Sequence, residues 1–221
     1  MDNSERIEEM GDNHISNNIE TPLREDAFEL DNEIKIELIQ KHFKEIMQVL
    51  GLDLTDESLK DTPKRVAKMY VNETFAGLNP KNQPKATLFE NNYQYKEMLV
   101  EKNIGFYSTC EHHFVPIFGK AHVAYISNGN VIGLSKLNRI VDFFAKRPQV
   151  QERMCIQIAN HLKEVLKTED VAVIMEAKHL CVASRGIKDD SSTTVTSSYH
   201  GKFNDCNTKS ELMTLIENDL K

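Results

Sequence analysis

The sequence predicts an α+β fold, in which an N-terminal pair of helices precedes strands and two long helices. Three observations support this prediction. Apolar residues recur at helical spacing in the first third of the chain, and between residues 115 and 125 they alternate instead at period two. Helical spacing then returns in two segments, near residues 135–147 and 154–165. A chain of 221 residues is long enough for one sizeable domain with a small helical addition.

The first predicted helix begins near Asn32 and ends at Gly51, a residue type that often terminates helices. Its apolar residues fall on one stripe: Ile36, Ile39, Phe43, Ile46, Met47 and Leu50. A second helix is predicted from Thr62 and Pro63, because a hydroxyl can cap a helix and proline suits the first helical position. Residues 79–86 contain two prolines and are predicted to be a linker.

The alternation from Val115 to Tyr125 predicts a strand that is interrupted at Gly119. Residues 128–130, Asn-Gly-Asn, predict a turn. Residues 131–134 are then expected to pair back with that strand.

Ser135 is predicted to cap the next helix. The apolar residues of this helix are Leu137, Ile140, Val141 and Phe144, and those of the following helix are Met154, Ile158, Leu162 and Val165. Residues 171–175 and 193–199 predict two further strands. Thr208 and Glu211 have the spacing of a capping box, which predicts the start of a last helix.

The bulk composition argues against several classes of protein. A formal net charge of -7 does not favour broad nucleic-acid binding, which depends on a positive field. The apolar runs are short and interrupted by charge, so we predict no membrane-spanning segment. Residues 1–30 are acidic and polar, with no apolar core and no clear period. They predict a flexible extension and no secretory signal, and the cytoplasm is the expected compartment.

The most informative segment is residues 110–115, Cys-Glu-His-His-Phe-Val. Cys110 and His113 are three positions apart, near enough for a thiolate and an imidazole to bind one ion. Cys181 is a candidate for a third ligand. Zinc suits this donor set, and three protein ligands leave a fourth position for water, as in catalytic zinc sites.

Spacing alone leaves other kinds of site open. A fourth ligand from Cys155 or Cys206 would make a closed, structural zinc site, and spacing does not separate the two possibilities. Cys155 lies on an apolar helix face, which favours a buried thiol, and Cys206 follows the last predicted strand in a polar segment. Iron and cobalt also bind thiolate and imidazole.

Three longer segments resemble the signature blocks of the GTP cyclohydrolase I family. They are CEHHFVPIFGKAHVAYI from residue 110, GLSKLNRIVDFFAKRPQVQERM from residue 133 and HLCVASRGI from residue 179. The segment DTPKRVAKMY from residue 61 also matches. The likeness covers roughly residues 35–218.

The resemblance implies the tunnelling fold, an antiparallel sheet with two long helices on one side, in which subunits join into a barrel. The chain then divides into the extension of residues 1–30, a helical region over 31–84 and a catalytic domain over 85–221. The resemblance also implies a homodecamer of two stacked five-membered rings, with active sites at subunit boundaries. The implied reaction is hydrolysis of GTP at carbon 8 of guanine, which releases formate and gives 7,8-dihydroneopterin triphosphate for folate or pterin synthesis.

The resemblance assigns roles to individual residues. Cys110, His113 and Cys181 are the implied zinc ligands. His112 and His179 are the implied acid–base residues, because attack on carbon 8 needs a proton donor at the purine.

The implied substrate-binding residues are Gln151 and Glu152 for guanine, and Ser135, Lys136, Arg139, Arg185, Arg65 and Lys68 for the triphosphate. The first three of the triphosphate group surround a helix start, whose exposed amides favour anions. Arg65 and Lys68 are expected to reach the site from a neighbouring subunit.

Two rival functions remain compatible with the residues. Another zinc hydrolase or a nucleotide deaminase would use similar ligands, although the H-x-E and P-C-x-x-C pair of zinc deaminases is absent from the sequence. A structural zinc domain or a non-enzymatic assembly subunit would have four protein ligands and no activity with GTP.

Overall fold

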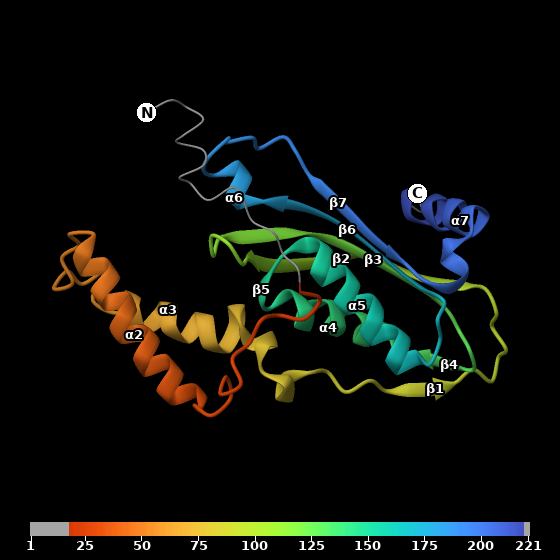
Figure 1. Ribbon diagram of the computed structural model, residues 1–221, viewed down its shortest axis with the longest axis horizontal. Helices are drawn as coiled ribbons and strands as arrows, with labels where there is room; N and C mark the ends of the chain where they lie inside the picture. Colours follow the sequence, from red (N-terminus) through yellow and green to blue (C-terminus); the bar gives the residue numbers. More distant parts are fainter. Residues whose placement is uncertain (1–17, 219–221) are drawn as a thin grey trace.

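The computed structural model describes residues 18–218, and the chain forms an α+β fold (Figure 1). A five-stranded sheet has the order β5-β2-β3-β6-β7, and the two long helices α4 and α5 lie on one face of it. A helical arm, formed by α2 and α3, projects to one side of the sheet. The predicted α+β class with a leading helical pair is therefore confirmed.

The arm begins as the sequence predicts. Helix α2 spans Asn32–Val49, and the Asp31 side chain caps it by accepting a hydrogen bond from the Ile34 amide at 2.9 Å. Gly51 follows the helix with a φ of +80°, a conformation that favours glycine. Helix α3 spans Thr62–Met69, so Pro63 lies in its first turn. The predicted cap is wrong by one position, because Asp61 is the cap residue and Thr62 is already helical.

Three short helical turns follow α3, and only the last of them falls within the predicted linker of residues 79–86. They are the π-helix η1 (Tyr70–Thr74) and the 3-10 turns η2 (Ala76–Leu78) and η3 (Pro80–Asn82). The Gly77 amide donates to the Lys146 carbonyl at 2.9 Å, at the end of α4. A Cβ at Gly77 would lie 2.0 Å from the Phe143 carbonyl oxygen, so this close contact between the arm and the core requires glycine.

The sheet is antiparallel except at one edge. Its strands are β2 (Met98–Cys110), β3 (Pro116–Ile126), β5 (Pro148–Gln149), β6 (Val171–His179) and β7 (Thr194–Tyr199), and β5 pairs with β2 in parallel. The sequence analysis missed β2, the longest strand. Its alternation is broken by a bulge between Glu101 and Ile104, with Asn103 at a φ of 60°.

The expected pairing of residues 131–134 with the preceding strand is wrong. Strand β4 (Asn130–Ile132) pairs instead with β1 (Leu88–Glu90) in a separate two-stranded sheet. The reason is that β3 is already hydrogen-bonded to β2 on one side and β6 on the other, so neither of its edges can accept β4.

The main core lies between the sheet and helices α4 (Leu134–Ala145) and α5 (Gln151–Leu166). The apolar stripes predicted for these helices are confirmed: Leu137, Val141, Met154, Ile158 and Leu162 are all at most 1% exposed. Burying each such side chain contributes roughly 1.5–3 kcal/mol. The predicted cap at Ser135 is wrong, because Gly133 is the cap residue and Ser135 lies inside the first turn.

Helix α7 (Cys206–Glu217) and the 3-10 turn η4 (Gly201–Asn204) cover part of the opposite face of the sheet (Figure 1). Phe203 and Leu212 pack there against Ala172 and Ile174. The predicted capping box at Thr208 is wrong, because Asp205 is the cap and accepts from the amides of Asn207 and Thr208.

Residues 18–30 of the predicted extension contain turns but neither helix nor strand, and residues 1–17 lie outside the described part of the chain. The Ile19 carbonyl accepts a hydrogen bond from the Gln157 side chain on α5 at 2.9 Å. Of the helices in residues 18–218, none combines the length and the apolar character needed to cross a bilayer. The barrel and the domain boundaries stay predictions.

Gly119 provides a test of the sheet register. A Cβ there would lie 2.0 Å from the Glu176 carbonyl oxygen and 2.6 Å from Ala177 Cα, both in β6. We expect Gly119→Ala to lower the free energy of unfolding, measured with urea, by about 3 kcal/mol or more. Gly105→Ala is the matched control, because a Cβ at this position in β2 meets nothing within 4 Å. Equal stability of the two variants would contradict the β3–β6 register.

Candidate active site

The site forms where two parallel strand ends meet the start of a helix. Strands β2 and β6 both run antiparallel to β3 and therefore parallel to each other, so their carboxyl ends reach the same edge of the sheet. Cys110 is the last residue of β2, and His179 is the last residue of β6. The short helix α6 (Leu180–Ala183) follows β6 and carries Cys181.

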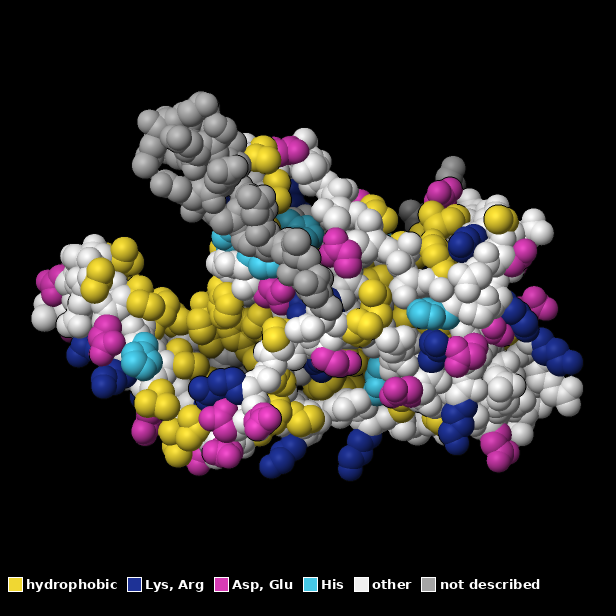
Figure 2. Space-filling model, viewed as in Figure 1, with side chains coloured by type: hydrophobic (Ala, Val, Ile, Leu, Met, Phe, Trp, Pro, Cys, Tyr) yellow, Lys and Arg dark blue, Asp and Glu magenta, His cyan; other side chains and the backbone are white. Residues whose placement is uncertain are grey.

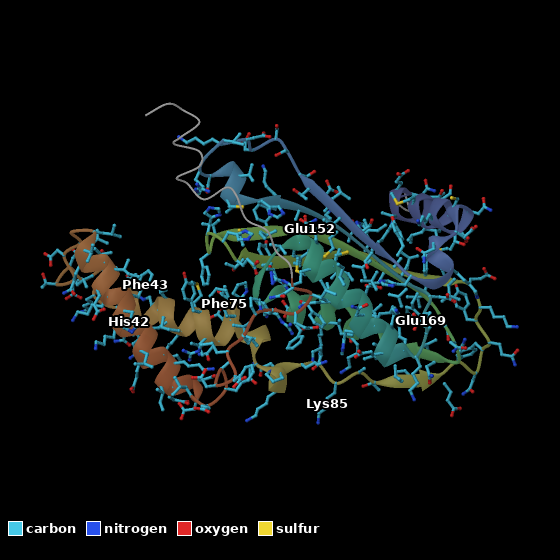
Figure 3. All side chains as sticks on the ribbon, viewed as in Figure 1. His42, Phe43, Phe75, Lys85, Glu152 and Glu169 are labelled. Carbon is cyan, nitrogen blue, oxygen red and sulfur yellow. The ribbon has the colours of Figure 1, made fainter. Side chains whose placement is uncertain are left out.

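A tight turn after β2 presents the two adjacent histidines. The Cys110 amide donates to the Val115 carbonyl at 2.8 Å, and the Phe114 amide donates to the Cys110 carbonyl at 2.9 Å. Phe114 adopts a φ of 54° in this turn, and its ring meets that of Phe75 from the arm with centroids 5.3 Å apart. The segment that follows α3 thus contacts the turn that holds His112 and His113. Phe75 is labelled in Figure 3.

Cys110, His113 and Cys181 come together as the sequence predicts. Their ligand atoms all lie within 4.8 Å of one another, and Cys110 Sγ is 3.9 Å from His113 Nδ1. The other two cysteines lie outside this group. Cys155 is buried and its thiol donates to the Val173 carbonyl at 3.3 Å, while Cys206 is exposed at the start of α7. The three-residue group fits one metal ion.

The two thiols of the group share a proton unequally. The pKa of Cys110 is lowered to about 4, chiefly by a hydrogen bond from the Cys181 thiol, with smaller contributions from His113 and from backbone amides. The pKa of Cys181 is raised, first because it donates that hydrogen bond and also because of burial. The lowered pKa favours the thiolate form of Cys110, in which cysteine binds metals.

Arg185 lies against His113, the imidazole of the group. Its Nη1 is 2.8 Å from His113 Nε2, so the guanidinium reaches the edge of the metal group. This contact places Arg185 beside the candidate site, where the resemblance implies a phosphate-binding role.

His179 is held by Gln151. His179 Nε2 lies 2.8 Å from Gln151 Oε1, and the Gln151 amide group donates to the carbonyls of Met175 and Thr194 and to the Thr196 hydroxyl at 3.0–3.1 Å. These bonds fix the orientation of the amide, so His179 Nε2 must be the donor to its oxygen. Burial lowers the pKa of His179, and the negative charges of Cys110 and Glu152 partly oppose that effect.

A pocket of about 540 Å³ opens above these side chains, within the usual range for small-molecule sites. Its lining includes Cys110, His112, Gln151, Glu152, His179 and Cys181. Glu152 is exposed at the start of α5, as Figure 3 shows, whereas Gln151 is only 1% exposed. The structure thus gathers both predicted guanine-binding positions and both predicted acid–base histidines around one pocket.

Five predicted triphosphate-binding residues lie elsewhere. They are Ser135, Lys136 and Arg139 on α4 and Arg65 and Lys68 on α3, and within residues 18–218 none of them lines this pocket. Arg139 lines a separate cavity of about 410 Å³ together with Asp142 and Lys146. Arg65 lies 3.8 Å from Asp61 on its own helix and is largely exposed. A single chain therefore presents only part of the predicted substrate site.

The sequence analysis missed three polar residues beside the pocket. Glu111, Arg153 and Gln149 form a buried group behind His112, and Arg153 is only 4% exposed. No local pattern pointed to them, because Glu111 follows β2, Gln149 ends β5 and Arg153 lies in α5.

The pocket brings together two cysteines and an imidazole, with two further histidines in reach. This arrangement is compatible with the active site of a metal-dependent enzyme. The family model described as GTP cyclohydrolase I matches residues 39–217. The chain belongs to the GTP cyclohydrolase I family, so the resemblance and the prediction of an enzyme of this kind are confirmed.

The relatives match over almost the whole chain. GTP cyclohydrolase 1 of Flavobacterium johnsoniae is 61% identical over 219 residues, which cover 99% of this chain and 98% of that protein. GTP cyclohydrolase 1 of Salmonella arizonae is 53% identical over 203 residues, 91% of each chain. Among solved structures, the archaeosine synthase QueF-Like in its apo form aligns with a TM-score of 0.42 and 15% identity, over 49% of this chain and 97% of that one. This likeness is too low to support a conclusion.

Metal content tests the three-residue group. We expect the purified protein to bind about one divalent ion per chain, and Cys181→Ala to lose most of it because two remaining ligands do not hold zinc tightly. Elemental analysis by mass spectrometry measures both. Cys206→Ala is the control, since this exposed cysteine lies outside the group. Full metal occupancy in Cys181→Ala would refute the ligand set.

Proposed function

We propose that the protein hydrolyses GTP at carbon 8 of guanine and releases formate, with 7,8-dihydroneopterin triphosphate as the product. The observation that carries the proposal is the convergence of Cys110, His113 and Cys181 in a pocket that Glu152 and two histidines also line or border. Membership of the GTP cyclohydrolase I family supports the same reaction.

Zinc is the proposed cofactor, held by Cys110, His113 and Cys181. The donor set fits, because two sulfurs and one ring nitrogen lie close together and the pKa of Cys110 is lowered. When bound, zinc would supply a Lewis acid that brings the pKa of water toward neutrality. The rest of the chemistry falls to side chains of the chain itself.

His112 is the proposed proton donor to the purine. Its Nδ1 lies 3.9 Å from Cys110 Sγ, so the ring stands directly beside the metal group and on the pocket wall. Protonating an imidazole nitrogen of guanine offsets the electron density that arrives when carbon 8 is attacked. His179 is proposed to orient water or to carry a proton through Nδ1, because its Nε2 is bound to Gln151.

Glu152 is the proposed guanine-reading residue. Its carboxylate can accept two hydrogen bonds, from the ring N–H and the amino group of guanine, an arrangement that adenine does not offer. The guanine contact predicted for Gln151 stays a prediction. Its side-chain amide is used by His179 and by β6 and β7, so we propose that Gln151 serves the substrate mainly through His179.

The triphosphate requires more than one chain under this proposal. Arg185 borders the metal group, whereas Ser135, Lys136 and Arg139 on α4, and Arg65 and Lys68 on α3, lie away from the pocket of their own chain. We propose that subunits supply them to each other in a homodecamer of two stacked five-membered rings, with GTP bound at subunit boundaries.

Exposed apolar side chains on α2 are consistent with further subunit contacts. Val49 and Leu50 are 89% and 71% exposed, and Figure 2 shows yellow apolar side chains on the arm that carries them. The cytoplasm stays the proposed compartment.

Formate release from GTP tests the reaction and the role of His112 together. We expect wild-type protein to release formate, and His112→Ala to release it about 100-fold more slowly or worse while keeping its metal, because a positioned proton donor typically contributes that much. His42→Ala is the control, since His42 is an exposed histidine on α2. Wild-type rates in His112→Ala would refute the assigned role, and a metal-loaded wild type without formate release would favour a structural zinc domain.

Calorimetric titration with GTP tests guanine recognition. We expect Glu152→Ala to weaken GTP binding by about 10- to 100-fold, because hydrogen bonds to a charged group contribute roughly 1.5–3 kcal/mol. Metal content should be unchanged. Glu164→Ala, an exposed carboxylate further along the same helix, is the control. Unchanged affinity in Glu152→Ala would overturn the guanine-recognition role.

A further inference from the structure

We propose that the partly buried ion pair between Glu111 and Arg153 is a positioning device for His112, which it holds against the metal group in the orientation needed for proton transfer. The inference rests on the proposed function and deepens it, because it adds residues that work through His112 to the site. Neither residue was assigned a role by the sequence analysis.

Arg153 is a nearly buried cation. It lies in the first turn of α5 with its side chain 3% exposed, and Arg153 Nη2 pairs with Glu111 Oε2. Taking a guanidinium out of water costs several kcal/mol unless it is paired and hydrogen-bonded. The chain therefore maintains a buried cation immediately behind the turn that carries the metal ligands.

Arg153 is itself held by an ordered row of amides. Its Nε donates to Gln149 Oε1 at 3.4 Å, and Gln149 Nε2 donates to the Phe144 carbonyl and to Gln157 Oε1, both at 2.9 Å. Gln149 is 0% exposed and Gln157 is 3% exposed. Every amide in the row has one orientation that satisfies these bonds, so the guanidinium cannot turn without leaving a buried polar group unpaired.

The backbone of Glu111 is fixed at the same place. Its amide donates to the Gln149 carbonyl at 3.0 Å, next to the position where β5 pairs with β2. Side chain and backbone of Glu111 are thus both bound to residues 149–153. The carboxylate is therefore fixed next to His112, which lines the pocket.

The second carboxylate oxygen faces His112. Glu111 Oε1 is 3.6 Å from His112 Nε2, while His112 Nδ1 is 3.9 Å from Cys110 Sγ on the other side of the ring. The imidazole therefore lies between the carboxylate of Glu111 and the sulfur of Cys110. Because Arg153 occupies Oε2, only Oε1 of this carboxylate remains to contact the ring.

Stability alone does not require this ion pair. Replacing a buried pair by apolar residues of similar volume is often neutral or stabilising, whereas removing one partner strands the other charge. We therefore assign the ion pair the role of orienting His112.

The test compares Glu111→Gln with the double variant Glu111→Gln/Arg153→Met, in which both charges are gone and neither is stranded. We expect kcat for formate release to fall about 10- to 100-fold in both, with KM for GTP and bound metal essentially unchanged. The double variant should also recover the stability to urea that Glu111→Gln loses. Glu169→Gln, which breaks an exposed ion pair with Lys163 on the same helix, should leave kcat unchanged.

A second readout does not depend on activity. The rate at which diethyl pyrocarbonate modifies His112, followed by peptide mass spectrometry, should rise several-fold in both variants, while the exposed His42 reacts as in the wild type. If the double variant regains both stability and wild-type kcat, the pair is merely structural and the proposal is overturned. If wild-type protein releases no formate, the proposed function fails. The positioning role is then tested separately, and an unchanged His112 modification rate in the double variant would overturn it.

Discussion

The candidate site depends on the close approach of the Cys110 and Cys181 sulfurs, which lie within 4.8 Å of each other near the ends of two parallel strands. Strand β3 separates β2 from β6 and sets both their direction and their register, so it determines that the two sulfurs meet. Burial opposes charge on either sulfur, yet the hydrogen bond from Cys181 and the nearby amides lower the pKa of Cys110. A lowered pKa favours the thiolate, the form in which cysteine binds metals.

A buried charge of this kind needs a rigid polar surrounding, and α5 supplies it on two faces. Gln151 holds His179 and links β6 to β7, while Arg153 holds Glu111 behind His112. Both residues lie in the first turn of the helix, on either side of the exposed Glu152. The same short segment can thus fix two histidines and leave one carboxylate open to a ligand.

The predicted phosphate-binding residues are distributed unevenly around the pocket. The pocket wall contains sulfur, imidazole and carboxylate groups, but most of the predicted phosphate-binding cations lie on α3 and α4, away from it. The contact between Phe75 and Phe114 ties the arm that bears α3 to the turn of the metal ligands. In the proposed assembly, subunit contacts made by the arm would therefore act on the turn that holds the metal ligands.

The sequence by itself determined the helices, the strand β3, the three metal-binding candidates and the two histidines, because these depend on local periodicity and on a distinctive Cys-x-His-His spacing. It also determined the family, since long ordered blocks carry that signal. It could not give β2, whose bulge breaks the alternation, nor the partner of β4, which follows from the edges left free by the sheet. Only the tertiary structure decided that Glu111, Gln149 and Arg153 meet behind His112, because a buried ion pair between a turn and a helix leaves no periodic trace in either segment.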